Sequence, residues 1–332
     1  MMNEGHGGAN ALGQAGCRKG IPVSVHVSPK RFRDEDARRQ GAEEDACMCF
    51  DQAALRTQLD AAEALGITHF NTFANFDVRW SQGEQEPIAE YLAAYLRAHP
   101  AMQMSSFHYV GSVYEEDPCF RELALDQMVQ AARLFGPCHP GCFVMHPGVF
   151  GEGRFKANLL RYRTAVERHG RAAVMEEVAA GIRVFADEAA RFGARIAVEN
   201  LYGGRVYSSM DELVELVERV DRDNVGYCLD IGHAHADSVD IPLAIHRLGN
   251  KIYELHVHDN RGTDEHLPVG FGIIDWVPII RALHEVGYAG TAAFEFFQWP
   301  GEGRSEGMGH AAALWKSLER LACEGYSYFS YL

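Results

Sequence analysis

Short apolar runs alternate with longer amphipathic stretches along most of the chain. Each run is rich in β-branched or other apolar residues and leads through a polar loop into a stretch with apolar residues three and four apart. That spacing is the helical period, so the runs predict strands and the stretches predict helices. The eight predicted strands are Val23–Val27, Thr68–Phe73, Met102–Tyr109, Cys142–His146, Arg195–Leu201, Val225–Ile231, Lys251–Val257 and Thr291–Phe297.

The helical stretches end at glycines. Gly66, Gly193, Gly249 and Gly287 stand where a helix should stop before the next strand begins. The predicted helices include Gln52–Leu65, Ile88–Arg97, Val178–Phe192, Asp211–Val220 and Trp276–Val286.

Eight strands alternating with helices over about 300 residues predict a closed (β/α)8 TIM barrel. We expect this barrel to form one domain at residues 21–332, behind a flexible leader at residues 1–20. An open doubly wound sheet is the alternative. Such sheets usually have a glycine-rich turn after the first strand, and Val27-Ser28-Pro29-Lys30 has none.

The charge balance narrows the range of functions. The chain of 332 residues has 31 Lys and Arg against 46 Asp and Glu, a net charge of −15. Surfaces that bind nucleic acid or anionic membranes rely on clustered basic residues, so we expect neither partner. No window approaches the roughly 18 apolar residues of a membrane span, and the N-terminus lacks the apolar core of a signal peptide. We therefore expect a cytoplasmic protein, with its scattered cysteines reduced.

Residues that can bind a metal stand at the ends of six consecutive predicted strands. These residues are His108, His146, Glu199, Asp230, His233, His256 and Glu295, and Asp264 and His266 follow in the loop after the seventh strand. In a parallel barrel all the carboxyl ends meet at one face, where the active site lies. Imidazole and carboxylate without cysteine are typical ligands of Zn, Mn, Fe or Co, so the pattern predicts a divalent-metal cofactor.

Each of these residues has a structural alternative when taken alone. A histidine at a strand end, such as His108, can be a hydrogen-bonded packing residue, and Asp230 with His233 can form a turn and a helix cap. Glu199 and Glu295 are harder to explain in this way, because each lies within an apolar strand where an unpaired carboxylate is costly. The agreement of six strands favours the metal site.

The segments around these residues resemble the xylose isomerase-like barrels, a family that contains sugar isomerases, epimerases and type IV apurinic endonucleases. The resemblance covers residues 22–321 and is densest from Ile196 to Phe297. The segments that carry it are Val198-Glu199-Asn200, Leu229–His235, Leu255–Asn260, Asp264–Pro268 and Phe294-Glu295-Phe296.

The resemblance implies a set of metal ligands. Isomerase and epimerase members hold one divalent metal through a Glu, an Asp, a His and a second Glu, which here implies Glu199, Asp230, His256 and Glu295. Endonuclease members hold three metals, and the further ligands would be His108, His146, His233, Asp264 and His266. The chain retains all of them, so the number of metals stays open. One departure is Gly270-Phe271-Gly272, where many isomerase-like members have Gly-Glu-Gly.

Three functions are compatible with this site. In a sugar or sugar-phosphate isomerase or epimerase, Glu199 and Glu295 would be the catalytic residues that move a proton next to a metal-polarised carbonyl. In a multi-metal phosphodiester hydrolase, the clustered metals would instead hold the attacking and leaving oxygens. A non-catalytic metal-binding barrel is the third alternative. The acidic charge favours the first function over a hydrolase of duplex DNA.

Several residues in the loops are candidates for binding a carbohydrate-like substrate. They are Arg154, Arg205, Arg261 and Trp299. Each has an ordinary alternative as a solvated or rim-packing residue. The long loop Lys30–Asp51 is expected at the catalytic face, either as a lid or as a solvated charged segment. Nothing in the pattern decides between a monomer and a homo-oligomer.

Overall fold

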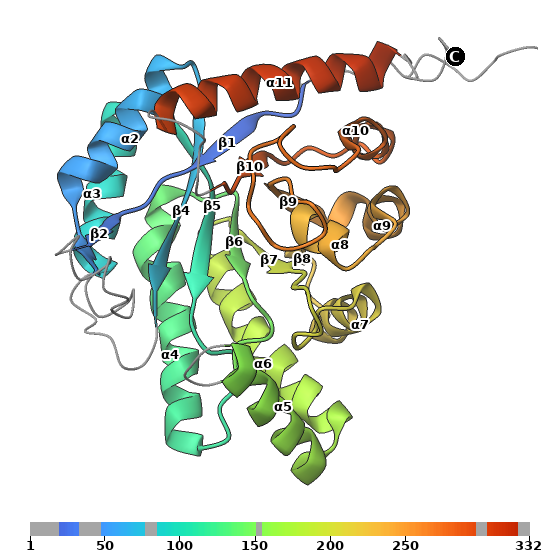
Figure 1. Cartoon of the computed structure of the whole chain (residues 1–332). Coiled ribbons are helices and arrows are strands. Elements are labelled where there is room, and N and C mark those ends of the chain that lie inside the picture. Colours follow the sequence, from blue (N-terminus) through green and yellow to red (C-terminus); the bar gives the residue numbers. More distant parts are fainter. Residues whose placement is uncertain (1–19, 33–47, 77–84, 151–154, 297–303, 325–332) are drawn as a thin grey trace, which may run out of the picture.

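Eight parallel strands close into a barrel with the order β1-β10-β9-β8-β7-β6-β5-β4 in the computed structural model of the chain (Figure 1). The structure describes residues 20–32, 48–76, 85–150, 155–296 and 304–324. The barrel strands are β1 (Val23–His26), β4 (His69–Asn75), β5 (Gln103–Val110), β6 (Cys142–Met145), β7 (Arg195–Glu199), β8 (Val225–Asp230), β9 (Ile252–Val257) and β10 (Ala292–Phe294). The predicted barrel and its eight strands are confirmed.

The first and last barrel strands close the sheet. Val25 of β1 is level with Phe294 of β10 on one side and with Phe70 of β4 on the other. Each strand is therefore hydrogen-bonded on both sides, and the barrel has no free edge.

Helices surround the barrel and connect its strands (Figure 1). They are α2 (Gln52–Ala64), α3 (Gln85–Ala98), α4 (Pro118–Phe135), α5 (Phe155–His169), α6 (Arg171–Ala190), α7 (Met210–Val220), α8 (Ile231–Ala236), α9 (Ile241–Leu248), α10 (Trp276–Glu285) and α11 (Arg304–Glu324), with the short 3-10 helices η3 (Gly136–Cys138) and η4 (Gly249–Lys251). Gly66 and Gly287, two of the predicted helix ends, have φ of 72° and 71°. Residues with a Cβ rarely adopt that conformation, which is why glycine stands there.

The barrel interior contains a buried polar cluster that we call the inner polar layer: Ser24, Ser105, Ser106, Glu254 and Thr291. Glu254 accepts hydrogen bonds from Ser106 Oγ at 3.0 Å and from Thr291 Oγ1 at 2.6 Å, and the hydroxyls of Ser24 and Ser105 are 2.6 Å apart. Burial raises the pKa of Glu254 to about 7. The layer is held together by its own hydrogen bonds.

A small antiparallel sheet follows β1. Its strands are β2 (Lys30–Phe32) and β3 (Met48–Phe50), with Lys30 opposite Phe50. The expected loop Lys30–Asp51 therefore begins and ends in a two-stranded ladder, and its residues 33–47 lie outside the described residues.

Two further observations concern the described residues. None of their helices has the length and apolarity to cross a bilayer. Cys119, Cys138, Cys142 and Cys228 are free thiols, as expected. Cys323 takes part in a disulfide, so the expectation of reduced cysteines is wrong for this residue.

Candidate metal centre at the carboxyl end of the barrel

The strands deliver the predicted metal-binding residues to one end of the barrel. Glu199 and Asp230 are the last residues of β7 and β8, and Asp230 stands directly opposite His256 of β9. His146 and Glu295 follow β6 and β10 immediately. The structure thus brings together all nine predicted residues in overlapping groups of possible ligands, one of which also contains His258. Following the ligand sets that the family resemblance implies, we divide the nine residues into a first, a second and a third subsite.

The first subsite consists of His108, His146 and Glu199. The two imidazole Nε2 atoms lie 3.6 Å and 3.2 Å from the same carboxylate oxygen, Oε2 of Glu199. The two rings are perpendicular, with their centroids 4.7 Å apart. Two nitrogens and one oxygen therefore face a common point.

The second subsite consists of Glu199, Asp230, His256 and Glu295. Nδ1 of His256 lies 3.3 Å from Oε1 of Glu199 and 3.3 Å from Oε2 of Glu295, and 3.8 Å from Oδ2 of Asp230. Glu199 takes part in the first and second subsites with different oxygens, so it is placed to bridge them.

Asp230 also caps a helix. It is the N-cap of α8, where its Oδ1 accepts a hydrogen bond of 2.7 Å from the backbone N–H of His233. The expected helix cap and the expected metal-binding carboxylate are therefore the same residue, with one oxygen for the helix and the other for the second subsite.

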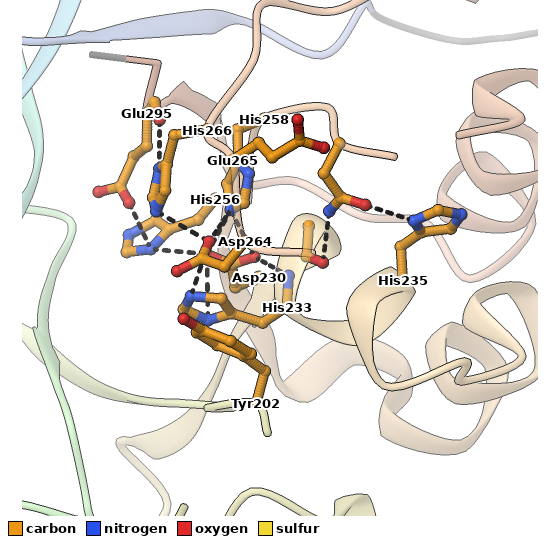
Figure 2. A network of polar contacts seen from close by, with 12 residues as sticks. Tyr202, Asp230, His233, His235, His256, His258, Asp264, Glu265, His266 and Glu295 are labelled. Carbon is orange, nitrogen blue, oxygen red and sulfur yellow. Dashed lines mark hydrogen bonds and ion pairs between the residues drawn. The ribbon is translucent and has the colours of Figure 1, made fainter. Parts of the chain in front are cut away.

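The third subsite consists of His233, Asp264 and His266 (Figure 2). Oδ1 of Asp264 lies 3.7 Å from Nε2 of His233 and 3.1 Å from Nε2 of His266. The Nδ1–H groups of the two histidines donate to the backbone carbonyls of Asn200 and Glu295, at 2.9 Å and 2.6 Å. Such a bond fixes the ring and places its proton on Nδ1, so that Nε2 is the nitrogen that would bind a metal.

Buried polar atoms inside the cluster lack hydrogen-bond partners, which tests whether a metal fits. Among the described residues, no donor or acceptor meets His108 Nε2, Glu199 Oε2, His256 Nδ1 or Asp264 Oδ1 in suitable geometry. Nearly all buried polar atoms in proteins are satisfied, so such a group needs an explanation. Every one of these atoms points to a subsite, and a divalent cation would satisfy them. The nitrogen and oxygen donors suit Zn, Mn, Fe or Co.

The charges of the cluster are set by burial and by contacts between its members. Burial alone would raise the pKa of Glu199, but facing His256 and His146 lowers it well below the usual range. Burial and His146 lower the pKa of His108 well below its ordinary value. Burial would also lower the pKa of His266, but Asp264 raises it to about 9. The first subsite thus holds an ionised carboxylate beside a neutral imidazole, the forms that metals bind.

Asp259 shapes the loop that carries the third subsite. Its buried carboxylate accepts hydrogen bonds from the backbone N–H of Gly270 and Ile274 and from Nε1 of Trp276. A Cβ on Gly272 would lie 2.2 Å from Oδ1 of Asp259, so the loop can close around Asp259 only if residue 272 is glycine. The glycines of the Gly270-Phe271-Gly272 segment therefore serve the loop, and Phe271 between them is 44% exposed.

The sequence did not single out two further histidines at this end of the barrel. His258 is fully buried, and its Nε2 lies 3.1 Å from Oδ1 of Asp230. His26, at the end of β1, is bonded through Nδ1 to Oδ1 of Asn71 at 2.7 Å. Strand alternation could have placed both, since each is two residues from another inward-facing residue, Ser24 or His256. Alternation alone gives no information on their partners.

The predicted substrate-binding residues have different positions. Arg205 donates to the hydroxyl of Tyr202 at 2.8 Å and lies 4.0 Å above its ring, which in turn stacks on His233. Arg261 pairs with Glu265 at 3.0 Å and has a side chain that is 59% exposed. Arg205 is thus connected to the third subsite, whereas Arg261 lies on the surface. Arg154 and Trp299 lie outside the described residues.

Comparison with known proteins places the chain in a family. Residues 59–318 match the family described as the xylose isomerase-like TIM barrel. Among curated proteins, the chain is 31% identical over 124 residues to an inosose isomerase of Bacillus subtilis, a match that covers 34% of this chain and 43% of that protein. It is 28% identical over 104 residues to a D-psicose 3-epimerase of Enterocloster bolteae, covering 31% and 33% of the two chains. The chain therefore matches less than half the length of either relative.

A solved structure supports the fold over nearly the whole chain. The crystal structure of an IOLI protein, described with a bound zinc atom, superposes with a TM-score of 0.62 at 16% identity. The superposition covers 92% of this chain and all of that one (100%). At this identity the likeness concerns the fold. With its closed barrel and the match over residues 59–318, the chain belongs to the xylose isomerase-like TIM barrel family.

Proposed function

We propose that the protein is a divalent-metal-dependent isomerase or epimerase of a sugar or a related cyclic polyol that carries a carbonyl group. The observation that carries this proposal is the second subsite. The carboxylates of Glu199 and Glu295 approach the same imidazole atom, Nδ1 of His256, at 3.3 Å each, and they come from strands on different sides of β9.

The two carboxylates supply what proton transfer beside a carbonyl requires. A divalent cation in the second subsite would polarise the substrate carbonyl and acidify the adjacent C–H bond. Glu199 and Glu295 would then stand on two sides of the reacting carbon. One of them can accept the proton and the other can return it. Since contact with His256 and His146 keeps the pKa of Glu199 low, this residue would act through its position more than through its basicity.

The relatives support the same class of substrate. Proteins named inosose isomerase and D-psicose 3-epimerase share sequence with this chain. A keto-inositol and a 2-ketose both place hydroxyl-bearing carbons next to a carbonyl. His26, which is partly exposed at the end of β1 and bonded to Asn71 through Nδ1, has a second ring nitrogen that is suited to a substrate hydroxyl.

Solvent-isotope exchange tests the proposal. The metal-loaded protein is incubated in D2O with a panel of ketopentoses, ketohexoses and keto-inositols, and deuterium is measured by NMR at the carbons next to the carbonyl. We expect incorporation with at least one member of the panel and its loss in Glu295→Gln. Glu285→Gln, which changes an exposed glutamate of α10, is the matched control. Absence of exchange across the whole panel would contradict the proposal.

One observation favours a second candidate, a multi-metal phosphodiester hydrolase. The three subsites adjoin one another, with Glu199 shared between the first two and Asp230 lying between the second and third. We nevertheless expect no useful cleavage of abasic duplex DNA, because the net charge of −15 opposes a polyanionic duplex. Efficient metal-dependent nicking would promote this candidate over the isomerase.

A further inference from the structure

His258 is a buried histidine that the proposed chemistry does not use. It follows the end of β9, two residues after His256. Its ring is fully buried and stacks on the ring of His266, with the centroids 3.9 Å apart and the planes 13° from parallel. Figure 2 shows it beside Asp230 and Asp264, at the boundary between the second and third subsites.

The shortest polar contacts of His258 are with the carboxylate of Asp230. Its Nε2 lies 3.1 Å from Oδ1 and 3.3 Å from Oδ2 of Asp230, and 4.0 Å from Oδ1 of Asp264. Its Nδ1 is buried and has no hydrogen-bond partner among the described residues. Two roles are conceivable for such a residue: a fourth ligand of the third subsite, or a donor that fixes Asp230.

The unpartnered Nδ1 decides between these roles. A histidine that binds a metal through Nε2 carries its proton on Nδ1 and donates it to a neighbour. His233 and His266 do so to backbone carbonyls, but His258 has no acceptor there. The Nε2–H tautomer avoids a buried, unsatisfied donor, and it directs the proton to Asp230.

The fold makes room for this ring at one position. A Cβ on Gly232 would lie 1.9 Å from Cε1 of His258 and 2.4 Å from its Nε2. The ring therefore rests against the backbone of the first turn of α8. Asn260 holds that turn in place by donating to the carbonyl of Gly232 at 2.8 Å.

We propose that His258 is a positioning residue that, seated against Gly232, fixes the carboxylate of Asp230 for metal binding. The backbone N–H of His233 donates to Oδ1 of Asp230 and Nε2–H of His258 donates to Oδ2, which fixes the carboxylate and leaves the second lone pair of Oδ2 for the second subsite. The proposal rests on the metal-dependent function proposed above. It concerns the affinity for the metal and not the reaction.

Two substitutions at position 258 separate the roles. In His258→Gln, the amide nitrogen reaches the place of Nε2 and can donate to Asp230, but an amide is a poor ligand for zinc. In His258→Leu, the ring volume is kept approximately and the donor is lost. Affinities for Zn2+ are measured by competition with a chromophoric chelator, and stoichiometries by elemental analysis. The electronic absorption of bound Co2+ reports the ligand set.

We expect His258→Gln to bind Zn2+ within about threefold of the parent, with an unchanged Co2+ spectrum. His258→Leu should bind at least one metal about 10 to 100 times more weakly, the usual effect of removing a partner of a metal ligand. Gly232→Ala, which would displace the ring, should resemble His258→Leu. His99→Leu removes a histidine on the outer side of the molecule, stacked on Tyr95, and is the control for loss of a histidine as such.

Other outcomes would overturn the proposal. If His258→Gln and His258→Leu both lose one equivalent of metal and change the Co2+ spectrum, His258 is a ligand. If both retain parental affinity, it has no role toward the metal. Circular dichroism of each variant verifies that the barrel has folded. Because no substrate is used, failure here leaves the isotope-exchange test of the proposed function untouched.

Discussion

The inner polar layer and the metal centre are both buried in the same barrel, but they satisfy their polar atoms in different ways. In the inner polar layer, both oxygens of Glu254 accept hydroxyl protons. In the candidate metal centre, Glu199 Oε2 and His256 Nδ1 are buried, and neither has a hydrogen-bond partner in suitable geometry among the described residues. The polar atoms of Glu254 are satisfied by hydrogen bonds within the protein, whereas several nitrogen and oxygen atoms of the candidate metal centre are not.

The contrast shows why burial alone does not identify a functional carboxylate. Glu254 and Glu199 are both about 1% exposed. Burial raises the pKa of Glu254 to about 7, whereas facing imidazoles lower the pKa of Glu199 despite its burial. A carboxylate kept ionised in an apolar barrel is suited to a cation, and one that is readily neutralised is suited to packing.

The largest expected effect comes from the carboxylates that we propose as catalytic, Glu199 and Glu295. Glu199→Gln and Glu295→Gln should each reduce turnover about 1,000-fold or more, because each removes a metal ligand and a group that moves the proton. Circular dichroism should show an intact barrel. Near-normal turnover by either variant with metal bound would show that the second subsite is not the reaction centre.

The next largest effect is expected in the amount of metal that the first subsite binds. His146→Asn keeps a hydrogen-bonding side chain but weakens metal ligation in the first subsite. We expect elemental analysis of the purified variant to show about one equivalent less metal than the parent. Chelator treatment should lower the melting temperature of the parent more than that of the variant, since bound metal stabilises the folded state. Equal metal content in both proteins would assign His146 to the substrate instead.

Glu254→Gln tests the other cluster through its dependence on pH. The pKa of Glu254 is about 7 in the folded protein against an ordinary value of 4.5, so the folded state binds more protons between these values. The unfolding free energy of the parent therefore falls as the pH rises from 4.5 to 7, by about 3 kcal/mol at most from this residue.

The Gln variant lacks this titration. Relative to the parent, it should gain stability between pH 4.5 and pH 8 in urea unfolding, and its metal content should not change. A constant difference between the two proteins across this range would mean that Glu254 is already ionised in the fold at acid pH.

Much of the barrel could be predicted from the sequence, because strands and helices differ in their hydrophobic period. The ends at Gly66 and Gly287 were also predictable from the conformation that glycine allows. The sheet of β2 and β3 was not, since strands of three residues are too short to show a period.

The candidate site, like the fold, was predictable in part from the sequence. Strand ends predicted which residues meet, because all parallel strands point the same way. The partner of each atom depends on distances of a few tenths of an ångström, which no spacing in the sequence records. The sequence offered the cap at Asp230 and the metal-binding carboxylate as alternatives, and it could not show that one residue does both or that His258 contacts Asp230.

The smallest expected effect belongs to a single hydroxyl of the inner polar layer. Thr291→Val removes the donor to Oε2 of Glu254 while keeping the shape of the side chain. We expect a loss of about 1 kcal/mol in the unfolding free energy. Metal affinity should stay as in the parent, and a change in metal affinity would show that the two clusters are coupled.

The two roles of the Asp230 carboxylate have a consequence for how the protein would acquire the proposed metal in the cell. One oxygen caps α8 and needs no cation to do so, and the rings of His233 and His266 are fixed by backbone carbonyls. Folding alone therefore positions these proposed ligands, before any ion binds. Since affinity alone does not set which divalent ion a nitrogen and oxygen site binds in the cell, the supply of each metal would help to decide which ion the newly made protein takes up.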